Sequence, residues 1–272
     1  MNISFWCEFP NKINWKKTGD FLKSIDKQTE IFIAVKSKKE FLNWKKKIKS
    51  KNIKLIPWVL LPKKHGYWFS GFSSREDIRH LEQFIGDKVF IDAEPPLSEI
   101  NKPFFKYAFY YIGLMFHSAV NLGFLEKEVE SLCKKNKVLY SEFPFPHLIF
   151  KRLGIYINSK HKKFNNNLEK VLGWYTTFFG ETFRFLIRPY LRHKARQVIN
   201  YYGNNKVSFA VGLVGSGISP SFECTYLSCE ELRDDLQDLQ NLGAKKVIIY
   251  SIESLMKKED LGSWKEVIKK YS

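Results

Sequence analysis

The sequence lacks the features that would assign it to several common classes of protein. Its four cysteines include no CxxC pair and no cluster with histidine at metal-ligand spacing, so no zinc site, other metal site, cofactor or disulfide framework is predicted. No segment reaches the roughly 20 apolar residues of a membrane span. The most apolar candidate, YAFYYIGLMF (107–116), is interpreted as a buried helix. The N-terminus has no basic start followed by an apolar stretch, so we expect no signal peptide and a cytoplasmic location.

Acidic residues are also scarce relative to basic ones. The 272 residues include 28 Asp and Glu against 45 Lys and Arg, which gives a formal net charge of +17. Such a charge predicts attraction to nucleic acid, phosphorylated ligands or an acidic membrane surface. The lysines are nevertheless spread through nearly every polar stretch, which favours a solvated basic surface with weak anionic binding, including peripheral membrane association. No aromatic–basic motif for nucleic acid is present, so that partner rests on charge alone.

Short apolar segments alternate with amphipathic segments along the whole chain. We predict strands at residues 3–9, 31–35, 53–61, 88–92, 137–143, 170–179, 206–215 and 244–252. Continuous apolar strands followed by helices are typical of a parallel sheet covered by helices. Eight such units in one chain of this length predict an α/β protein with a single (β/α)8 TIM barrel over residues 1–272. A doubly wound sheet is the alternative, but the first strand runs into CEFPNK and not a glycine-rich turn.

Three connecting regions carry further expectations. A long helical region is predicted after the fourth strand, up to about Lys134. Residues 144–169 are too long for an ordinary connection, so we expect an excursion over the catalytic face. A helix is predicted from about Glu181 to Tyr202, with a kink or break at Pro189.

That last helix carries an arginine every fourth residue, which places the arginines in one stripe. The stripe consists of Arg184, Arg188, Arg192 and Arg196. A solvated outer face of a barrel helix is the favoured interpretation, and an anionic membrane surface is the alternative.

Acids and aromatic residues recur where the predicted strands end. In a (β/α)8 barrel the active site is built at these carboxyl ends. Asp92 and Glu94 end the fourth strand and, two residues apart, share one face. Glu142 ends the fifth strand, and Tyr175 follows the sixth. Two carboxylates in a partly desolvated site cannot both ionise easily, so one can act as a general acid, as glycoside hydrolysis requires.

Other residues at the same ends are candidates for binding a substrate. Flat aromatic rings suit sugar rings, and the loop LPKKHGYWFSG after the third strand is the most distinctive of these segments. The predicted binding residues are Glu8, Trp58, His65, Tyr67, Trp68 and Trp174. The sequence therefore predicts a hydrolase of carbohydrate metabolism that acts on a carbohydrate or glycoconjugate.

Two motifs resemble the chitinase-like family 18 glycoside hydrolases. DKVFIDAE (87–94) is similar to the DxxDxDxE signature of that family, with Asp87, Asp92 and Glu94 on matching positions and Phe90 in place of the second aspartate. GWYT (173–176) is similar to its strand-6 segment. The resemblance implies that Glu94 is the general acid/base, that Asp92 and Tyr175 hold the acetamido group, and that the substrate's own carbonyl is the nucleophile.

Two alternatives remain open. Other barrel hydrolases would use Glu94 as acid/base and Glu142 as nucleophile. The glycines of GLVGSG (212–217) follow the seventh strand, where barrels often bind phosphate through backbone amides, so a non-hydrolytic barrel for an anionic or phosphorylated ligand is the alternative function.

Overall fold

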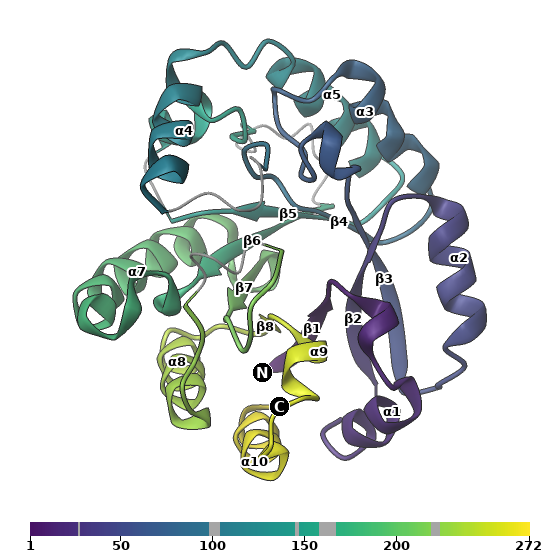
Figure 1. The fold of residues 1–272 in the computed structure, drawn as a ribbon, viewed down its shortest axis with the longest axis vertical. Coiled ribbons are helices and arrows are strands. Elements are labelled where there is room, and N and C mark those ends of the chain that lie inside the picture. The colour runs from purple at the N-terminus through teal and green to yellow at the C-terminus, as the bar shows by residue number, and fades with distance from the viewer. Residues whose placement is uncertain (27, 98–103, 145–146, 158–166, 219–223) are drawn as a thin grey trace. The chain divides into compact units, whose positions relative to one another are not determined.

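The structure is a computed structural model that describes residues 1–272 except 27, 98–103, 145–146, 158–166 and 219–223. Eight parallel strands close into a barrel in chain order, which confirms the predicted (β/α)8 fold (Figure 1). The strands are β1 (Asn2–Cys7), β2 (Thr29–Val35), β3 (Ile53–Val59), β4 (Val89–Ile91), β5 (Val138–Glu142), β6 (Leu168–Trp174), β7 (Val207–Val211) and β8 (Lys246–Ile249).

Helices follow the strands. The α-helices are α1 (Trp15–Lys23), α2 (Lys38–Lys47), α3 (Arg75–Arg79), α4 (Phe104–Phe116), α5 (Leu122–Cys133), α6 (His147–Arg152), α7 (Gly180–Tyr202), α8 (Cys229–Asn241), α9 (Ile252–Leu255) and α10 (Leu261–Tyr271). Short 3-10 turns lie at Pro10–Lys12, Lys63–His65, His80–Phe84, Thr176–Phe179 and Asn204–Lys206.

The chain forms two compact units. Unit 1 consists of residues 1–34, 43–56 and 171–272, and unit 2 consists of residues 35–42 and 57–170. Each unit has its own core.

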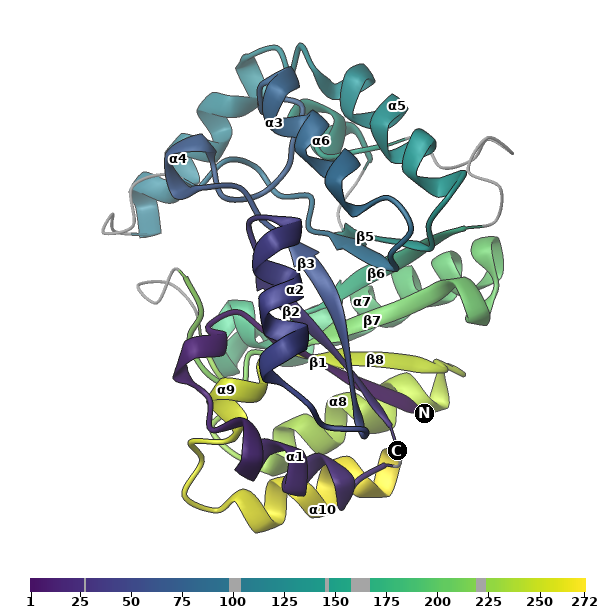
Figure 2. The ribbon, with the colours of Figure 1, turned by 90° about the vertical axis from the view of Figure 1, so that its right-hand side faces the viewer.

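The core of unit 1 forms around neighbouring strands with continuous apolar sequences. Phe5 on β1 lies opposite Ile31 on β2 and Ile249 on β8, and all three are fully buried. α8 and α10 lie side by side, as Figures 1 and 2 show. α10 buries Trp264 and Ile268, which lie one turn apart on the same face of the helix.

The core of unit 2 also forms around neighbouring strands with apolar sequences. Phe90 on β4 lies opposite Trp58 on β3 and Leu139 on β5, and these side chains are buried. α5 places Leu125 and Val129 on its buried face at helical spacing.

The structure corrects two expectations about helices. The region up to Lys134 contains two helices, α4 and α5, separated by residues 117–121. α7 continues through Pro189 without a break. Proline has no amide hydrogen, so one backbone carbonyl in the preceding turn of the helix loses its donor. Pro189 lies on the exposed side of α7, so that carbonyl can bond to water. Of the expected excursion, residues 145–146 and 158–166 lie outside the described part, and the remainder contains α6.

The arginine stripe is packed against α8 more than it is solvated. Arg188 pairs with Asp235 at 2.8 Å and with Asp238 at 3.1 Å, and Arg192 pairs with Asp238 at 2.6 Å. Arg184 pairs with Glu231 in the same way. Acids of α8 therefore neutralise much of the stripe.

Candidate active site

The acids after β4 lie in an extended segment that pairs with the loop after β3. β4 ends one residue before Asp92, whose carbonyl accepts a hydrogen bond from the Phe69 amide at 3.2 Å. Ala93 forms a parallel bridge with Phe69. Farther along, the Leu97 amide donates to the Gly66 carbonyl at 2.8 Å. The loop thus fixes the backbone on both sides of Glu94.

Asp92 is a buried carboxyl whose hydrogen-bond partners are a hydroxyl and an indole. Its residue is 7% exposed, and burial raises the pKa of Asp92 to about 7, against the lowering effect of hydrogen bonds from Ser141 and Trp58. The hydroxyl of Ser141 also accepts the Ala93 amide at 2.6 Å. Asp92 can therefore hold or release a proton near neutral pH. Glu94, two residues later, is half-buried.

Three of the predicted binding aromatics are buried near this segment. Trp58 is 2% exposed, and its ring centroid lies 6.3 Å from that of Phe90. Tyr67 and Trp68 are buried edge to face, with ring centroids 5.2 Å apart. Tyr67 has a φ of 68°, in the left-handed region that residues other than glycine rarely adopt. Such conformations gather at ligand sites, which supports a role for this loop in binding.

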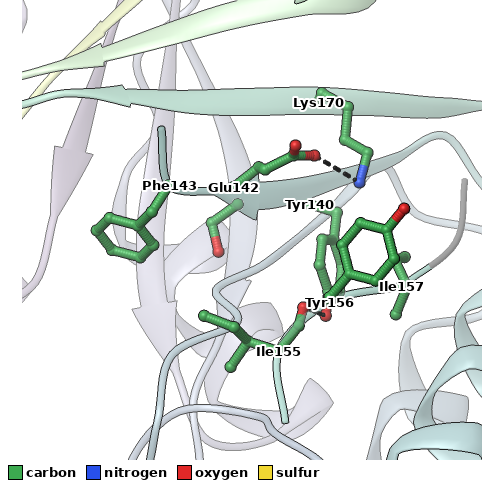
Figure 3. Close-up of a pocket in the computed structure, with 8 residues that line it drawn as sticks. Tyr140, Glu142, Phe143, Ile155, Tyr156, Ile157 and Lys170 are labelled. Carbon is green, nitrogen blue, oxygen red and sulfur yellow. Dashed lines mark hydrogen bonds and ion pairs between the residues drawn. The ribbon is translucent and has the colours of Figure 1, made fainter. Parts of the chain in front are cut away.

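Two other predicted residues contact oppositely polar side chains within hydrogen-bond distance. The Nδ1 of His65 lies 2.6 Å from Asp77. Glu142 lies 3.0 Å from the Nζ of Lys170, whose side chain is only 2% exposed (Figure 3). The ammonium of Lys170 also lies 5.2 Å from the ring centroid of Tyr140.

The Glu142–Lys170 pair lines a small pocket on one face of β5. The space in and around the pocket that no atom fills is about 210 Å³, and part of it is open solvent. Its lining is residues 140–143, 155–157 and Lys170. Successive residues of a strand face opposite sides, so Glu142 faces away from Ser141, the neighbour of Asp92.

Unit 1 has its own buried acids at the ends of β1 and β8. Glu8 is 6% exposed and accepts a hydrogen bond from the hydroxyl of Tyr250. Glu253 accepts the Glu8 amide at 2.9 Å and the Phe9 amide at 3.2 Å, and burial raises its pKa. A Cβ at Gly217 would collide with Tyr250 and lie 3.0 Å from the Glu8 carboxylate. A carboxylate so near this glycine opposes a bound phosphate, which weakens the phosphorylated-ligand alternative.

Successive residues at the end of β6 and just after it have different surroundings. Trp174 is fully buried, with its ring 6.4 Å from that of Phe209, and it presents no face to a substrate. Thr176 donates to Asp235 on α8 at 2.6 Å. Tyr175, between them, is half-buried, and its ring lies 3.8 Å from where a Cβ of Gly212 would be.

Sequence reasoning passed over several buried polar residues of these clusters, notably Ser141, Tyr250, Glu253 and Asp235. Glu253 directly follows the strand that the sequence predicts over 244–252, so the rule about strand ends could have found it, although the structure places it in α9. Ser141 and Asp235 carried no such signal, because a serine within a strand and an acid within an amphipathic helix are usually solvated.

Comparisons with known proteins identify the fold. No family model matches the chain, and no curated protein matches it in sequence. The PgaB (BpsB) glycoside hydrolase domain from Bordetella bronchiseptica is similar in structure, with 12% identity over 98% of this chain and 99% of that one, at a TM-score of 0.58. The chain has the fold of TIM-barrel glycoside hydrolases.

Two further solved structures agree on this fold. The catalytic domain of β-amylase from Paenibacillus polymyxa matches at 11% identity and a TM-score of 0.56, covering 100% of this chain and 98% of that one. Active domain 2 of chitinase from Pyrococcus furiosus, solved as catalytic site mutants, matches at 7% identity and a TM-score of 0.50, covering 99% and 94%. At these identities the likeness concerns the fold.

Proposed function

We propose that the protein is a glycoside hydrolase that cleaves a glycosidic bond in a carbohydrate or glycoconjugate by carboxylate acid/base catalysis. The observation that carries the proposal is Asp92, a buried carboxyl with a pKa of about 7 at the end of β4. It lies two residues before the half-buried Glu94, in a fold shared with glycoside hydrolases. Carboxyl groups with raised pKa values are the acid catalysts of glycoside hydrolysis.

In the proposed mechanism, Glu94 gives its proton to the leaving oxygen as the glycosidic bond breaks. Asp92 keeps its own proton up to about pH 7 and can donate a hydrogen bond to the substrate. Glu142 faces the other side of β5 in its pair with Lys170, which favours attack by the substrate's acetamido carbonyl over attack by Glu142. The proposed substrate is therefore a β-linked sugar polymer or glycoconjugate that carries N-acetyl groups.

The test measures hydrolysis of β-linked N-acetylhexosamine oligosaccharides and of matched oligosaccharides without the acetyl group. We expect Glu94→Gln to lower kcat by about 10²–10⁴-fold, because the amide cannot donate the proton. Glu76→Gln is the matched control, since Glu76 is an exposed acid of the same unit. Full activity of Glu94→Gln, or no hydrolysis by the unsubstituted protein on either set, would overturn the proposal.

A further inference from the structure

Helix α4, labelled in Figure 1, presents apolar side chains to solvent. Phe109 is 70% exposed, Ile112 is 51% exposed and Phe116 is 83% exposed. Val120, just beyond the helix, is 78% exposed. None of the side chains described in α4, at positions 109–116, is buried, although the helix is almost entirely apolar. Exposed apolar clusters of this kind mark interaction sites.

A second helix of unit 2 extends this surface. α6 packs against α4 and carries Leu148, which is 70% exposed. Lys151 and Arg152 follow at positions three and four residues later, so they share a face with Leu148 and are exposed as well. We call Phe109, Ile112, Phe116, Val120 and Leu148 the α4 patch.

The sequence around the α4 patch is basic and contains no acids. Residues 100–125 and 143–168 include no aspartate or glutamate. The basic side chains described there are those of Lys151 and Arg152, and both are exposed. This pattern differs from that of α7, where acids of α8 neutralise the arginines.

Apolar and aromatic side chains beside the exposed cations Lys151 and Arg152 fit the boundary of an anionic bilayer. Such a surface takes up apolar side chains between the lipid headgroups and attracts lysine and arginine. A second copy of the chain fits less well, because a symmetric dimer would bring the basic segments of both copies together. Within the described part of the chain, no helix has the length and apolar character needed to cross a bilayer.

We propose that the α4 patch docks the protein on an anionic membrane surface, with Phe109 and Phe116 inserted among the headgroups and Lys151 and Arg152 facing anionic lipid phosphates. The proposal does not depend on the catalytic function. It predicts binding that requires both apolar insertion and charge.

The test is co-sedimentation of the full chain with phosphatidylcholine vesicles that contain or lack phosphatidylserine. We expect the protein to bind the anionic vesicles and to bind neutral vesicles at least about tenfold more weakly. Binding to the anionic vesicles should weaken as the salt concentration rises from ~50 to ~500 mM. Phe109→Ser with Phe116→Ser should lower the affinity for anionic vesicles by about tenfold or more. Lys151→Gln with Arg152→Gln should lower it less and reduce its salt dependence.

Matched controls separate the α4 patch from general properties of the chain. Phe185→Ser removes a 67% exposed phenylalanine from α7, and Lys16→Gln with Lys17→Gln removes two exposed lysines from α1. These variants should bind like the unsubstituted protein.

Three outcomes would overturn the proposal. The first is no binding to anionic vesicles, and the second is equal loss in the control variants. The third is a dimer in light scattering that Phe109→Ser with Phe116→Ser dissociates, since a second copy would then cover the α4 patch. Circular dichroism of each variant distinguishes loss of binding from loss of fold.

Discussion

Two buried aspartates, one in each compact unit, differ in what surrounds them. Asp235 on α8 of unit 1 is fully buried beside the cation Arg188 at 2.8 Å, with hydroxyl donors from Thr176 and Tyr226 each at 2.6 Å. Asp92 of unit 2 is buried with a hydroxyl and an indole as hydrogen-bond partners, and its pKa rises to about 7. Burial raises the pKa of Asp235 too, but Arg188 opposes the rise.

The difference separates a structural acid from a candidate catalytic one. A buried carboxylate that faces a cation is held ionised and joins the elements around it; here Asp235 joins α7, α8 and the segment after β6. A buried carboxyl with neutral partners exchanges its proton near the working pH, which is what acid/base chemistry requires. The following substitutions test whether this contrast holds.

The largest effect is expected for Arg188→Met. Removing the cation leaves the buried Asp235 without its ion-pair partner, so it must either stay buried as an uncompensated anion or take up a proton, and the free energy of unfolding should fall by about 3–5 kcal/mol. Urea unfolding followed by circular dichroism measures this change. Adding Asp235→Leu should restore much of the loss, because the uncompensated charge is then gone. If the double variant is less stable than Arg188→Met, Asp235 is held by its hydroxyl donors and not by the ion pair.

The next largest effect is expected for Asp92→Asn, and it depends on pH. The folded pKa of about 7 lies above the unfolded value of ~3.9, so the folded protein binds the extra proton between these values and its stability falls as pH rises through that window. The cost of the buried charge is complete above pH ~7. Asn carries no charge, so the variant should gain on the order of 2–4 kcal/mol relative to the unsubstituted protein at pH 8, and nothing at pH 4.

Urea unfolding at several pH values measures the predicted slope. A difference between the two proteins that is independent of pH would mean that Asp92 titrates normally. Under the proposed function, Asp92→Asn should also lose glycosidase activity. The same substitution would then raise the stability of the protein and lower its catalytic activity.

Much of the fold could be predicted from the sequence because each strand is a continuous apolar run with breaks at its ends. β4 was expected over 88–92 and spans Val89–Ile91. The sixth strand was expected over 170–179, but β6 ends at Trp174, because the chain turns into a 3-10 helix at Thr176–Phe179, where Thr176 and Thr177 are buried without strand pairing.

The candidate site was less predictable, because a side chain's neighbours depend on contacts between distant segments. The sequence places Asp92 and Glu94 at a strand end, yet nothing in it indicates that Ser141 lies beside Asp92. Glu142 follows the same rule about strand ends, but alternation along β5 turns it toward Lys170. The arginine spacing in α7 is visible in the sequence, whereas the matching acids of α8 lie about 45 residues later and become partners through packing.

A smaller effect is expected for Tyr226→Phe. The substitution removes one donor to Asp235 and leaves Thr176 and Arg188 in place, so the free energy of unfolding should fall by about 1–2 kcal/mol. Thermal unfolding of the variant measures the change. A loss as large as that of Arg188→Met would mean that the hydroxyl, and not the cation, carries the stability of this cluster.

The smallest effect is expected for Arg192→Met, which is the matched control for Arg188→Met. Both arginines lie on the same stripe and both contact Asp238, but the side chain of Arg192 is 41% exposed and that of Arg188 is 19% exposed. Water screens the exposed pair, and Asp238 keeps Arg188, so the loss should stay below about 1 kcal/mol in urea unfolding. Suppose that Arg192→Met lowers the free energy of unfolding as much as Arg188→Met does. The whole arginine stripe would then stabilise the packing of α7 on α8, and the contact of Arg188 with the buried Asp235 would have no special effect.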